Sequence, residues 1–258
     1  MQKAQRANGL GTKGFGLAAG LCFTTLIGCG GAELGGEPEN LGPYAEQGEW
    51  HEYMAAATDT VADAADSGAC STAAIRGLSD QIVFQMNCIR SGLMTRIDGY
   101  NVSFASAAAL PYLQTPAATA LNRATTSRSR LSLNSTLRSV AQQYMLYHWY
   151  KTGTCGVQLA AAPGQSNHED GMALDTSDYS AWRSALTGAG FRWFGSSDVV
   201  HFDYPGGVDA QGVLAFQRLW NRNNPGDKIS EDGSYGPQTE ARIRRSPRVG
   251  FAGTQTCR

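Results

Sequence analysis

The sequence predicts an α+β fold. Apolar residues recur at helical spacing in several stretches, of which 72–89 is the clearest. Short segments such as 130–133 instead alternate polar and apolar residues, as a strand does. Helices and strands do not follow each other in strict βαβ order, which argues against a parallel α/β sheet. The chain has 258 residues, of which 42% are hydrophobic, so it can bury a core and a wholly disordered chain is excluded.

The first 28 residues predict an export signal. Met1 to Lys13 holds three cations and no acid, and 14–28 is an apolar run too short to span a bilayer. The run ends in Leu26-Ile27-Gly28-Cys29, which resembles a bacterial lipobox with cleavage before Cys29 and lipidation of its sulfur. Gly30 rather than Asp follows, which by resemblance implies the periplasmic face of the outer membrane. The alternative is an ordinary signal peptide that happens to end near a cysteine.

Four cysteines remain once Cys22 leaves with the signal and Cys29 carries lipid, namely Cys70, Cys88, Cys155 and Cys257. An even number in an oxidising compartment predicts two disulfides, and four cysteines allow three connectivities. We favour Cys70–Cys88 with Cys155–Cys257, because the first pair closes a short loop. The sequence has no C-x-x-C pair, which argues against a structural zinc knot.

The remaining elements follow in chain order. Residues 29–60 are rich in Gly, Glu and Pro and predict a flexible tether, and 72–89 predicts a helix with a buried apolar stripe. Weaker patterns between 102 and 126 predict turns and a short helix. Residues 130–133 predict a strand, and Asn134 or Ser135 is expected to cap a helix from Thr136 to about Thr152 that ends at Gly153.

The last third of the chain predicts three more helices and a strand. A helix over 180–189 stops at Gly190, and a strand over 199–204 ends at Pro205. The tail from 211 to 245 predicts two helices around a turn-rich loop at 221–236.

Two segments carry residues with metal chemistry, 166–175 and 198–204. His168, Asp175 and His201 make a set of two imidazoles and one carboxylate. Catalytic zinc commonly takes three such ligands and keeps a fourth position for water, whose pKa it lowers to about 7. Asp198, three residues before His201, is placed to move a proton between that water and the leaving amine. Spacing alone does not establish a metal site, because a histidine seven residues before an aspartate is common by chance.

Together the two segments resemble the zinc D-alanyl-D-alanine carboxypeptidases of VanY type. That family shows S-x-H-x-x-G-x-A-x-D, followed later by an acid, two residues and a histidine. The matching residues here are Ser166, His168, Gly171, Ala173, Asp175, Asp198 and His201. The resemblance covers roughly 131–204. It implies a small antiparallel sheet that holds a zinc ion and is flanked by helices, as in hedgehog-like and D-Ala-D-Ala peptidase folds.

The resemblance also extends upstream, to residues 137–143. By this match Arg138 would bind a substrate carboxylate or the developing oxyanion. The planar guanidinium suits this role because it can donate two hydrogen bonds to a carboxylate. Gln143 and Ser166 would hold the peptide terminus. The alternative for Arg138 is a charge on a helix surface. The family often has Glu where Asp198 stands and Tyr where Leu137 stands. Asp at the position of Asp198 recurs in related endopeptidases. The resemblance therefore does not establish which peptide bond is cut.

Two sets of residues have weaker interpretations. Three acidic residues neighbour the expected ligands, namely Glu169, Asp170 and Asp203. We expect them on the solvated surface or in hydrogen bonds that support a ligand. Asp203 could orient His201 in this way. Residues 215–220, which include Phe216-Gln217, and residues 232–239 resemble part of a peptidoglycan-binding repeat. The alternative is that this tail only packs against the rest of the chain.

We therefore expect a zinc metallopeptidase that acts on peptidoglycan stem peptides, as a D-alanyl-D-alanine or related D,D/L,D carboxypeptidase. The alternatives are an endopeptidase of the same fold and a noncatalytic wall-binding lipoprotein. The expected parts are a signal (1–28), a tether (29–60), a peptidase domain (61–205) and a C-terminal helical segment (206–258). We expect a monomer that contacts the membrane only through its lipid. The 21 basic and 22 acidic residues exclude a polybasic nucleic-acid binder.

Overall fold

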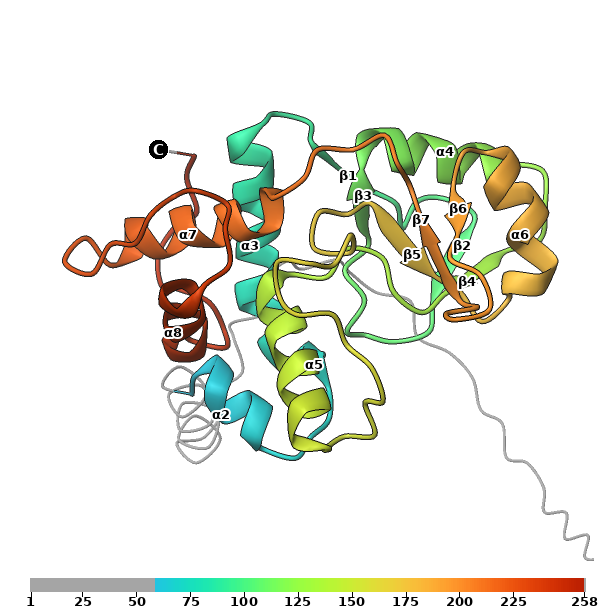
Figure 1. Ribbon diagram of the computed structural model, residues 1–258. Helices are drawn as coiled ribbons and strands as arrows, with labels where there is room; N and C mark the ends of the chain where they lie inside the picture. Colours follow the sequence, from blue (N-terminus) through green and yellow to red (C-terminus); the bar gives the residue numbers. More distant parts are fainter. Residues whose placement is uncertain (1–58, 258) are drawn as a thin grey trace, which may run out of the picture. The chain divides into compact units, whose positions relative to one another are not determined.

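The computed structural model describes residues 59–257. The expected signal peptide, the lipidated Cys29 and nearly all of the tether lie outside the described residues. The elements in chain order are α2 (Val61–Asp66), the 3₁₀ turn η1 (Thr72–Ile75), α3 (Arg76–Ile89), β1 (Met94–Arg96), β2 (Val102–Phe104), β3 (Tyr112–Gln114), α4 (Thr115–Thr125), β4 (Leu131–Leu133), α5 (Val140–Thr152), β5 (Ala173–Asp175), α6 (Tyr179–Gly188), β6 (Arg192–Trp193), β7 (His201–Asp203), α7 (Gln211–Asn223) and α8 (Pro237–Arg245). The α+β prediction is confirmed (Figure 1). Within this range, no helix is both long and apolar enough to cross a membrane.

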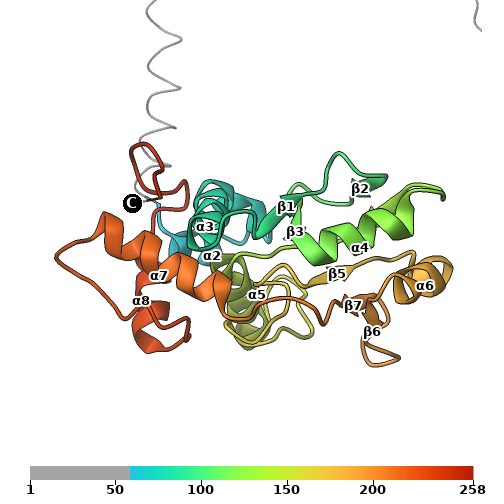
Figure 2. The ribbon, with the colours of Figure 1, turned by 90° about the horizontal axis from the view of Figure 1, so that it is seen from above.

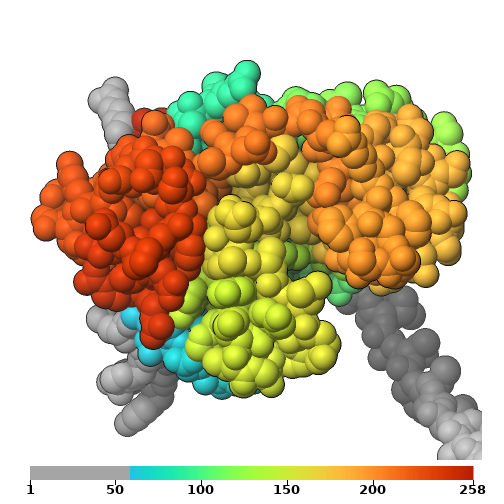
Figure 3. All heavy atoms as spheres, viewed as in Figure 1, coloured from blue at the N-terminus to red at the C-terminus, as the bar shows by residue number. Residues whose placement is uncertain are grey.

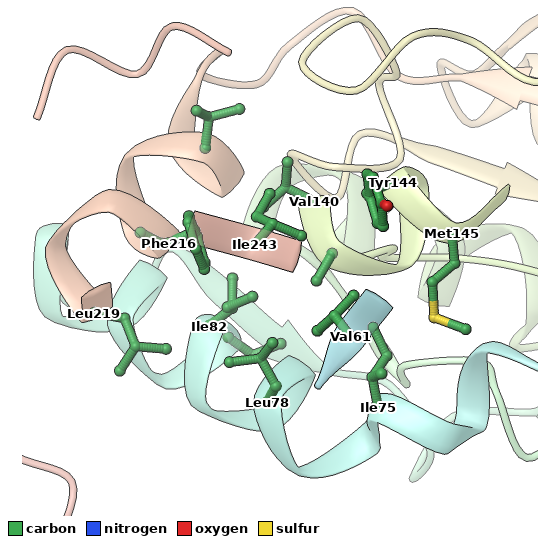
Figure 4. Close-up of a cluster of buried hydrophobic side chains, with 14 of the residues drawn as sticks. Val61, Ile75, Leu78, Ile82, Val140, Tyr144, Met145, Phe216, Leu219 and Ile243 are labelled. Atoms are coloured by element: carbon green, nitrogen blue, oxygen red, sulfur yellow. The ribbon is translucent and has the colours of Figure 1, made fainter. Parts of the chain in front are cut away.

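One core is built from helices that are far apart in the sequence. Helices α2, α3 and α5 meet the C-terminal helices α7 and α8, and α3 packs along α7 (Figures 1 and 2). Leu78 and Ile82 of α3 lie against Phe216 and Ile243 of the tail in a fully buried cluster (Figure 4). The tail therefore shares its core with the N-terminal helices.

A second core lies between the three-stranded sheet and helices α4 and α6. The sheet has the order β5-β7-β6 and is antiparallel throughout. Leu174 of β5 and Phe202 of β7 are fully buried and pack in the cluster that contains Leu121 of α4 and Leu186 of α6. Since side chains alternate between the two faces of a strand, the neighbours of Leu174 and Phe202 point to the opposite face, where the site described below is found.

The smaller strand pairs lie outside this sheet. Strands β1 and β3 pair antiparallel, and β2 and β4 pair in parallel over three residues each. An isolated bridge joins Ser135, just after β4, to Asp175 at the end of β5. This bridge ties the chain before α5 to the strand that carries a predicted metal ligand.

Two disulfides are present as predicted, but the favoured pairing is wrong. The bonds join Cys70 to Cys155, with a Cα–Cα distance of 5.1 Å, and Cys88 to Cys257, with a Cα–Cα distance of 5.0 Å. The stretch between Cys70 and Cys88 is mostly the 14-residue helix α3. Such a helix is about 21 Å long, whereas disulfide-bonded Cα atoms lie within about 7 Å, so this segment cannot close as a loop. Cys88 near the C-terminus of α3 instead anchors the end of the tail.

Helix α5 starts later than the sequence pattern predicts. Ser139 is its N-cap: its Oγ accepts a hydrogen bond from the Gln142 N–H, and the Gln142 Oε1 accepts one from the Ser139 N–H. This reciprocal capping box competes successfully with Asn134 and Ser135, and it leaves 136–138 outside the helix. Gly153 ends the helix as predicted, with a φ of 68°. The later start frees Thr136 and Arg138 for contacts with the site.

Candidate metal centre

Three side chains with ligand chemistry converge on the open face of the sheet. One ligand atom from each of His168, Asp175 and His201 lies within 4.8 Å of the others. The His201 Nδ1 is 2.9 Å from the Asp175 Oδ1, and the His168 Nε2 is 3.3 Å from the Asp175 Oδ2. The two imidazoles approach each other to 3.2 Å between the His168 Nε2 and the His201 Nδ1. The structure thus brings together all three residues that the sequence predicts as ligands.

Backbone pairing positions two of the three. Asp175 and His201 are register partners at the ends of β5 and β7, so their side chains emerge side by side from the same face. His168 comes from the turn before β5, in which the Gly171 N–H donates to the His168 carbonyl. Gly171 has a φ of 70°, and a Cβ there would lie 2.5 Å from the Met94 methyl carbon. The positive φ is a backbone conformation that favours glycine, so the conformation of the turn accounts for the glycine of the motif.

The second nitrogen of each imidazole is held by an acceptor. The His168 Nδ1 lies 2.7 Å from the Thr136 carbonyl, and the His201 Nε2 lies 2.8 Å from the Asp203 Oδ1. The Asn167 side-chain amide also donates to this Asp203 oxygen, at 2.8 Å. These partners leave the His168 Nε2 and the His201 Nδ1 directed at Asp175. Imidazoles that bind a metal are typically oriented in this way, so the donor set fits a metal ion.

Burial and neighbouring charges shift the pKa values of all three side chains. Burial lowers the pKa of His168, which favours its neutral, ligating form. Burial opposes ionisation of Asp175, but His168, His201 and Arg138 together hold the pKa of this carboxyl well below its ordinary value. Burial also acts against a charge on His201, yet its hydrogen bonds to Asp175 and Asp203 raise its pKa to about 9. His201 must therefore lose a proton before its Nδ1 can bind a metal at neutral pH.

The three side chains open into a cavity of about 430 Å³. In the space-filling view, the surface is hollowed between the yellow loop after α5 and the orange segment around β6 and β7 (Figure 3). The residues that line the cavity are Arg138, Leu159, Ala160, Ala161, Gln165, Ser166, Asn167, His168, Asp175, Phe194, Ser197, Asp198, His201 and Asp203. Three further predicted site residues, Arg138, Ser166 and Asp198, thus share this cavity with the ligand set.

Arg138 faces the cavity from the extended segment before α5. Its guanidinium donates to the Gln143 Oε1 at 2.8 Å and to the Ser135 Oγ at 3.1 Å, and it lies 3.6 Å from the Asp175 Oδ2. Its side chain is 19% exposed, so the alternative of a charge on a helix surface does not hold. Gln143 is buried behind it and donates to the Ala161 carbonyl. The amide of Gln143 therefore contacts Arg138 and the cavity loop but not the cavity itself.

Glu169 and Asp170 are engaged in the fold rather than solvated. The buried Glu169 carboxylate accepts hydrogen bonds from the Gly164 and Ser166 N–H groups, and burial raises its pKa to about 8 in spite of them. The Asp170 carboxylate accepts three backbone hydrogen bonds from residues 210–212. Asp203 orients His201, as expected. Sequence reasoning missed Thr136 and Asn167, whose role arises only from contacts across the fold.

Comparison with protein families supports the sequence resemblance. Residues 111–195 match the VanY family, described as D-alanyl-D-alanine carboxypeptidase. A search of curated proteins finds no match for the chain. The matched region contains Arg138, His168 and Asp175, and it ends before Asp198 and His201. His201 of strand β7 comes from beyond that boundary.

Proposed function

We propose that this chain, with its VanY-type region, is a zinc-dependent peptidase that cleaves peptidoglycan stem peptides. Its most direct activity would be that of a D-alanyl-D-alanine or related D,D/L,D carboxypeptidase. The observation that carries the proposal is the meeting of His168, Asp175 and His201 in a cavity that Arg138 and Asp198 also line. This arrangement combines a metal-binding set, a group for a substrate carboxylate and a candidate proton carrier.

The metal would be held by the His168 Nε2, the His201 Nδ1 and the Asp175 carboxylate. Two neutral imidazoles and one carboxylate suit zinc and leave a divalent ion with net positive charge. Bound zinc supplies a Lewis acid that polarises a carbonyl and lowers the pKa of a water molecule. The Thr136 carbonyl and Asp203 keep the two rings oriented for this task.

Arg138 is the group that would recognise the substrate. It is the only Lys or Arg among the described residues that line the cavity. An arginine carries five N–H donors, and the contacts to Gln143 and Ser135 use two of them. The remaining donors can bind a terminal carboxylate or the oxyanion that develops on the scissile carbonyl. Gln143 would act by holding Arg138, and Ser166 would hydrogen-bond the peptide terminus from the cavity wall.

Asp198 would transfer the proton. It lines the cavity in the segment that enters β7, and its carbonyl accepts a hydrogen bond from the His201 N–H at 3.3 Å. Its carboxylate would accept a proton from the attacking water and deliver it to the leaving amine. This role supports a prediction of lost turnover with retained metal for Asp198→Ala.

A second candidate is an endopeptidase that cuts within the stem peptide. It is favoured by Leu159 and Phe194, which line the cavity from opposite loops. With 74% and 57% of their surface exposed, they are the most exposed large apolar side chains that the structure describes. Such exposed apolar surface beside a site is typical of ligand contacts. It could pack against substrate residues on both sides of the cleaved bond.

The cellular location that we propose is the cell envelope, with the protein exported and held by a lipid on Cys29. The lipobox-like segment Leu26-Ile27-Gly28-Cys29 supports this proposal. The two disulfides fit it as well, because such bonds persist in oxidising compartments.

The proposed function is tested by digesting muropeptides that end in D-Ala-D-Ala with the full chain and zinc. Mass spectrometry of the products should show loss of one terminal alanine. Cleavage inside the stem would identify the endopeptidase instead. His168→Ala is the matched control and should release nothing. Binding to intact sacculi without any cleavage, by a chain shown to contain zinc, would make it a wall-binding protein and refute the enzyme.

A further inference from the structure

Helix α7 receives its N-terminal cap from a residue beside the metal site. Its N-cap position is Ala210, which has a φ of 62° and no polar side chain to offer. The Asp170 carboxylate fills this role, accepting hydrogen bonds from the N–H groups of Ala210 at 2.8 Å, Gln211 at 2.7 Å and Gly212 at 2.9 Å. A carboxylate at this place satisfies the unpaired N–H groups and interacts favourably with the helix dipole.

The start of α7 also approaches the metal-binding loop more closely than a side chain would permit. A Cβ on Gly212 would lie 2.3 Å from the Glu169 carbonyl oxygen. Gln114 bridges the same two segments, since its Nε2 donates to the carbonyls of Asp170 and Val208 and its Oε1 accepts from the Val208 N–H. The first turn of α7 is therefore in close backbone contact with Glu169, the neighbour of Asp170 in the loop.

A second part of the tail contacts the loop farther upstream. Tyr235, in the turn before α8, packs so closely on Gly164 that a Cβ there would lie 2.7 Å from the Tyr235 Cβ. The Gly164 N–H in turn donates to the Glu169 carboxylate at 2.9 Å. Both ends of the 164–170 loop thus touch the C-terminal segment, and His168 lies between these two contacts.

The loop is short enough for a displacement at one end to reach His168. The Glu169 N–H donates to the Ser166 carbonyl at 2.9 Å, and the Gly171 N–H donates to the His168 carbonyl at 3.1 Å. Asp170 lies within the second of these turns, two residues after the ligand. A shift of its backbone would be passed to His168 through two peptide planes, which rotate as rigid units.

From these contacts we infer that Asp170 is a positioning residue of the metal centre. Through it, the C-terminal segment 206–257 holds the loop that places the His168 imidazole beside Asp175 and His201. The tail is therefore part of the metal site and not an independent appendage. This inference rests on the proposed function, in that it takes the three side chains as metal ligands.

The test compares Asp170→Asn with the wild type in the full chain. Asparagine keeps the shape and one acceptor oxygen, but it loses the charge and the second acceptor. Zinc affinity is measured by competition with a chelator, and the cobalt-substituted protein gives an absorption spectrum that reports the ligand geometry. We expect zinc binding to weaken at least about tenfold, the scale known for groups that orient metal ligands, and the cobalt spectrum to change.

Asp232→Asn is the matched control. The Asp232 carboxylate also accepts a backbone hydrogen bond, from the Ser234 N–H at 2.9 Å, and one from the Gln217 side chain at 2.9 Å, but both partners lie within the tail. Both bonds go to one oxygen, which asparagine keeps, so this variant should lower the melting temperature of the metal-free protein less than Asp170→Asn does and leave zinc affinity within about twofold of wild type. Equal loss of zinc affinity in the two variants would overturn the inference, since it would reflect general weakening of the tail.

Unchanged zinc affinity and an unchanged cobalt spectrum in Asp170→Asn would also overturn it. A wild-type chain that binds no zinc would refute the proposed function itself, so the two failures are distinguishable. If Asp170→Asn does not fold, Gly212→Ala provides the test in its place. The added methyl group pushes α7 away from the Glu169 carbonyl. Weaker zinc binding in that variant supports the inference, and wild-type affinity contradicts it.

Discussion

Asp175 and His201 are direct register partners of β5 and β7, and the His201 Nδ1 lies 2.9 Å from the Asp175 Oδ1. This pairing joins two motifs that are separated in the sequence by a helix and a strand. It also makes the site sensitive to strand register. A slip of one residue would turn His201 toward the core that Phe202 now fills, so the buried Phe202 and Leu174 specify the register on which the site depends.

Zinc binding to the metal-free chain at pH 7 should release about one proton from His201, beyond the share lost by the zinc-bound water. The pKa of His201 is raised to about 9, so its ring is protonated at pH 7 and must lose a proton to bind through Nδ1. Above pH 9 the ring is already neutral, so the share from His201 should disappear and only the proton lost by the zinc-bound water should remain. Calorimetry in two buffers of different ionisation enthalpy measures it. A proton count that stays near zero at pH 7, with zinc bound, would contradict this coupling.

Asp203→Asn should weaken zinc binding by about 10- to 100-fold, because the His201 ring loses its anionic acceptor. The amide cannot hold both His201 and Asn167 through one charged oxygen as Asp203 does. Chelator competition measures the affinity. Asp98→Asn, which removes an exposed carboxylate paired with Arg96, is the control and should bind zinc as the wild type does. Equal affinities for all three proteins would show that Asp203 has no orienting role.

Arg138→Lys should lower kcat/KM for a substrate with a free terminal carboxylate while leaving zinc bound. Lysine keeps the charge but not the planar pair of donors that a carboxylate or oxyanion accepts. Arg138→Ala should lower kcat by about 100- to 1,000-fold, which is the effect of removing one donor to the oxyanion. Steady-state kinetics and a zinc assay on the same samples check both. Loss of zinc along with activity would mean that Arg138 holds the site together, not the substrate.

The disulfide pairs can be read directly from non-reduced peptides. Proteolysis and mass spectrometry should link Cys70 to Cys155 and Cys88 to Cys257. Replacing Cys88 and Cys257 together by serine should lower the free energy of unfolding by about 2–5 kcal/mol, because the end of the tail is released from α3. A peptide that links Cys70 to Cys88 would contradict the pairing.

The parts that the sequence could predict are those that local patterns determine. Gly153 and Gly190 mark where helices stop, and the motif around His168 and Asp175 identifies candidate ligands through residue types at given spacings. The parts it could not predict depend on contacts between distant segments. Ser139 is the helix cap in place of Ser135 because Gln142 completes its capping box. The disulfide pairing depends on the rigid helix α3, which keeps Cys70 away from Cys88, and not on the length of the loop between cysteines. The roles of Thr136 and Asp170 arise only when the folded chain brings them to His168 and to α7.

The central claim, a catalytic zinc site made by His168, Asp175 and His201, is tested most directly by a zinc titration. Metal is stripped from the full chain, zinc is added in measured equivalents, and release of D-Ala from a stem peptide ending in D-Ala-D-Ala is followed. Release should rise with added zinc and level off at about one zinc per chain, as a three-ligand site requires. Release that is undiminished in the stripped chain, or absent at every zinc level, would contradict it.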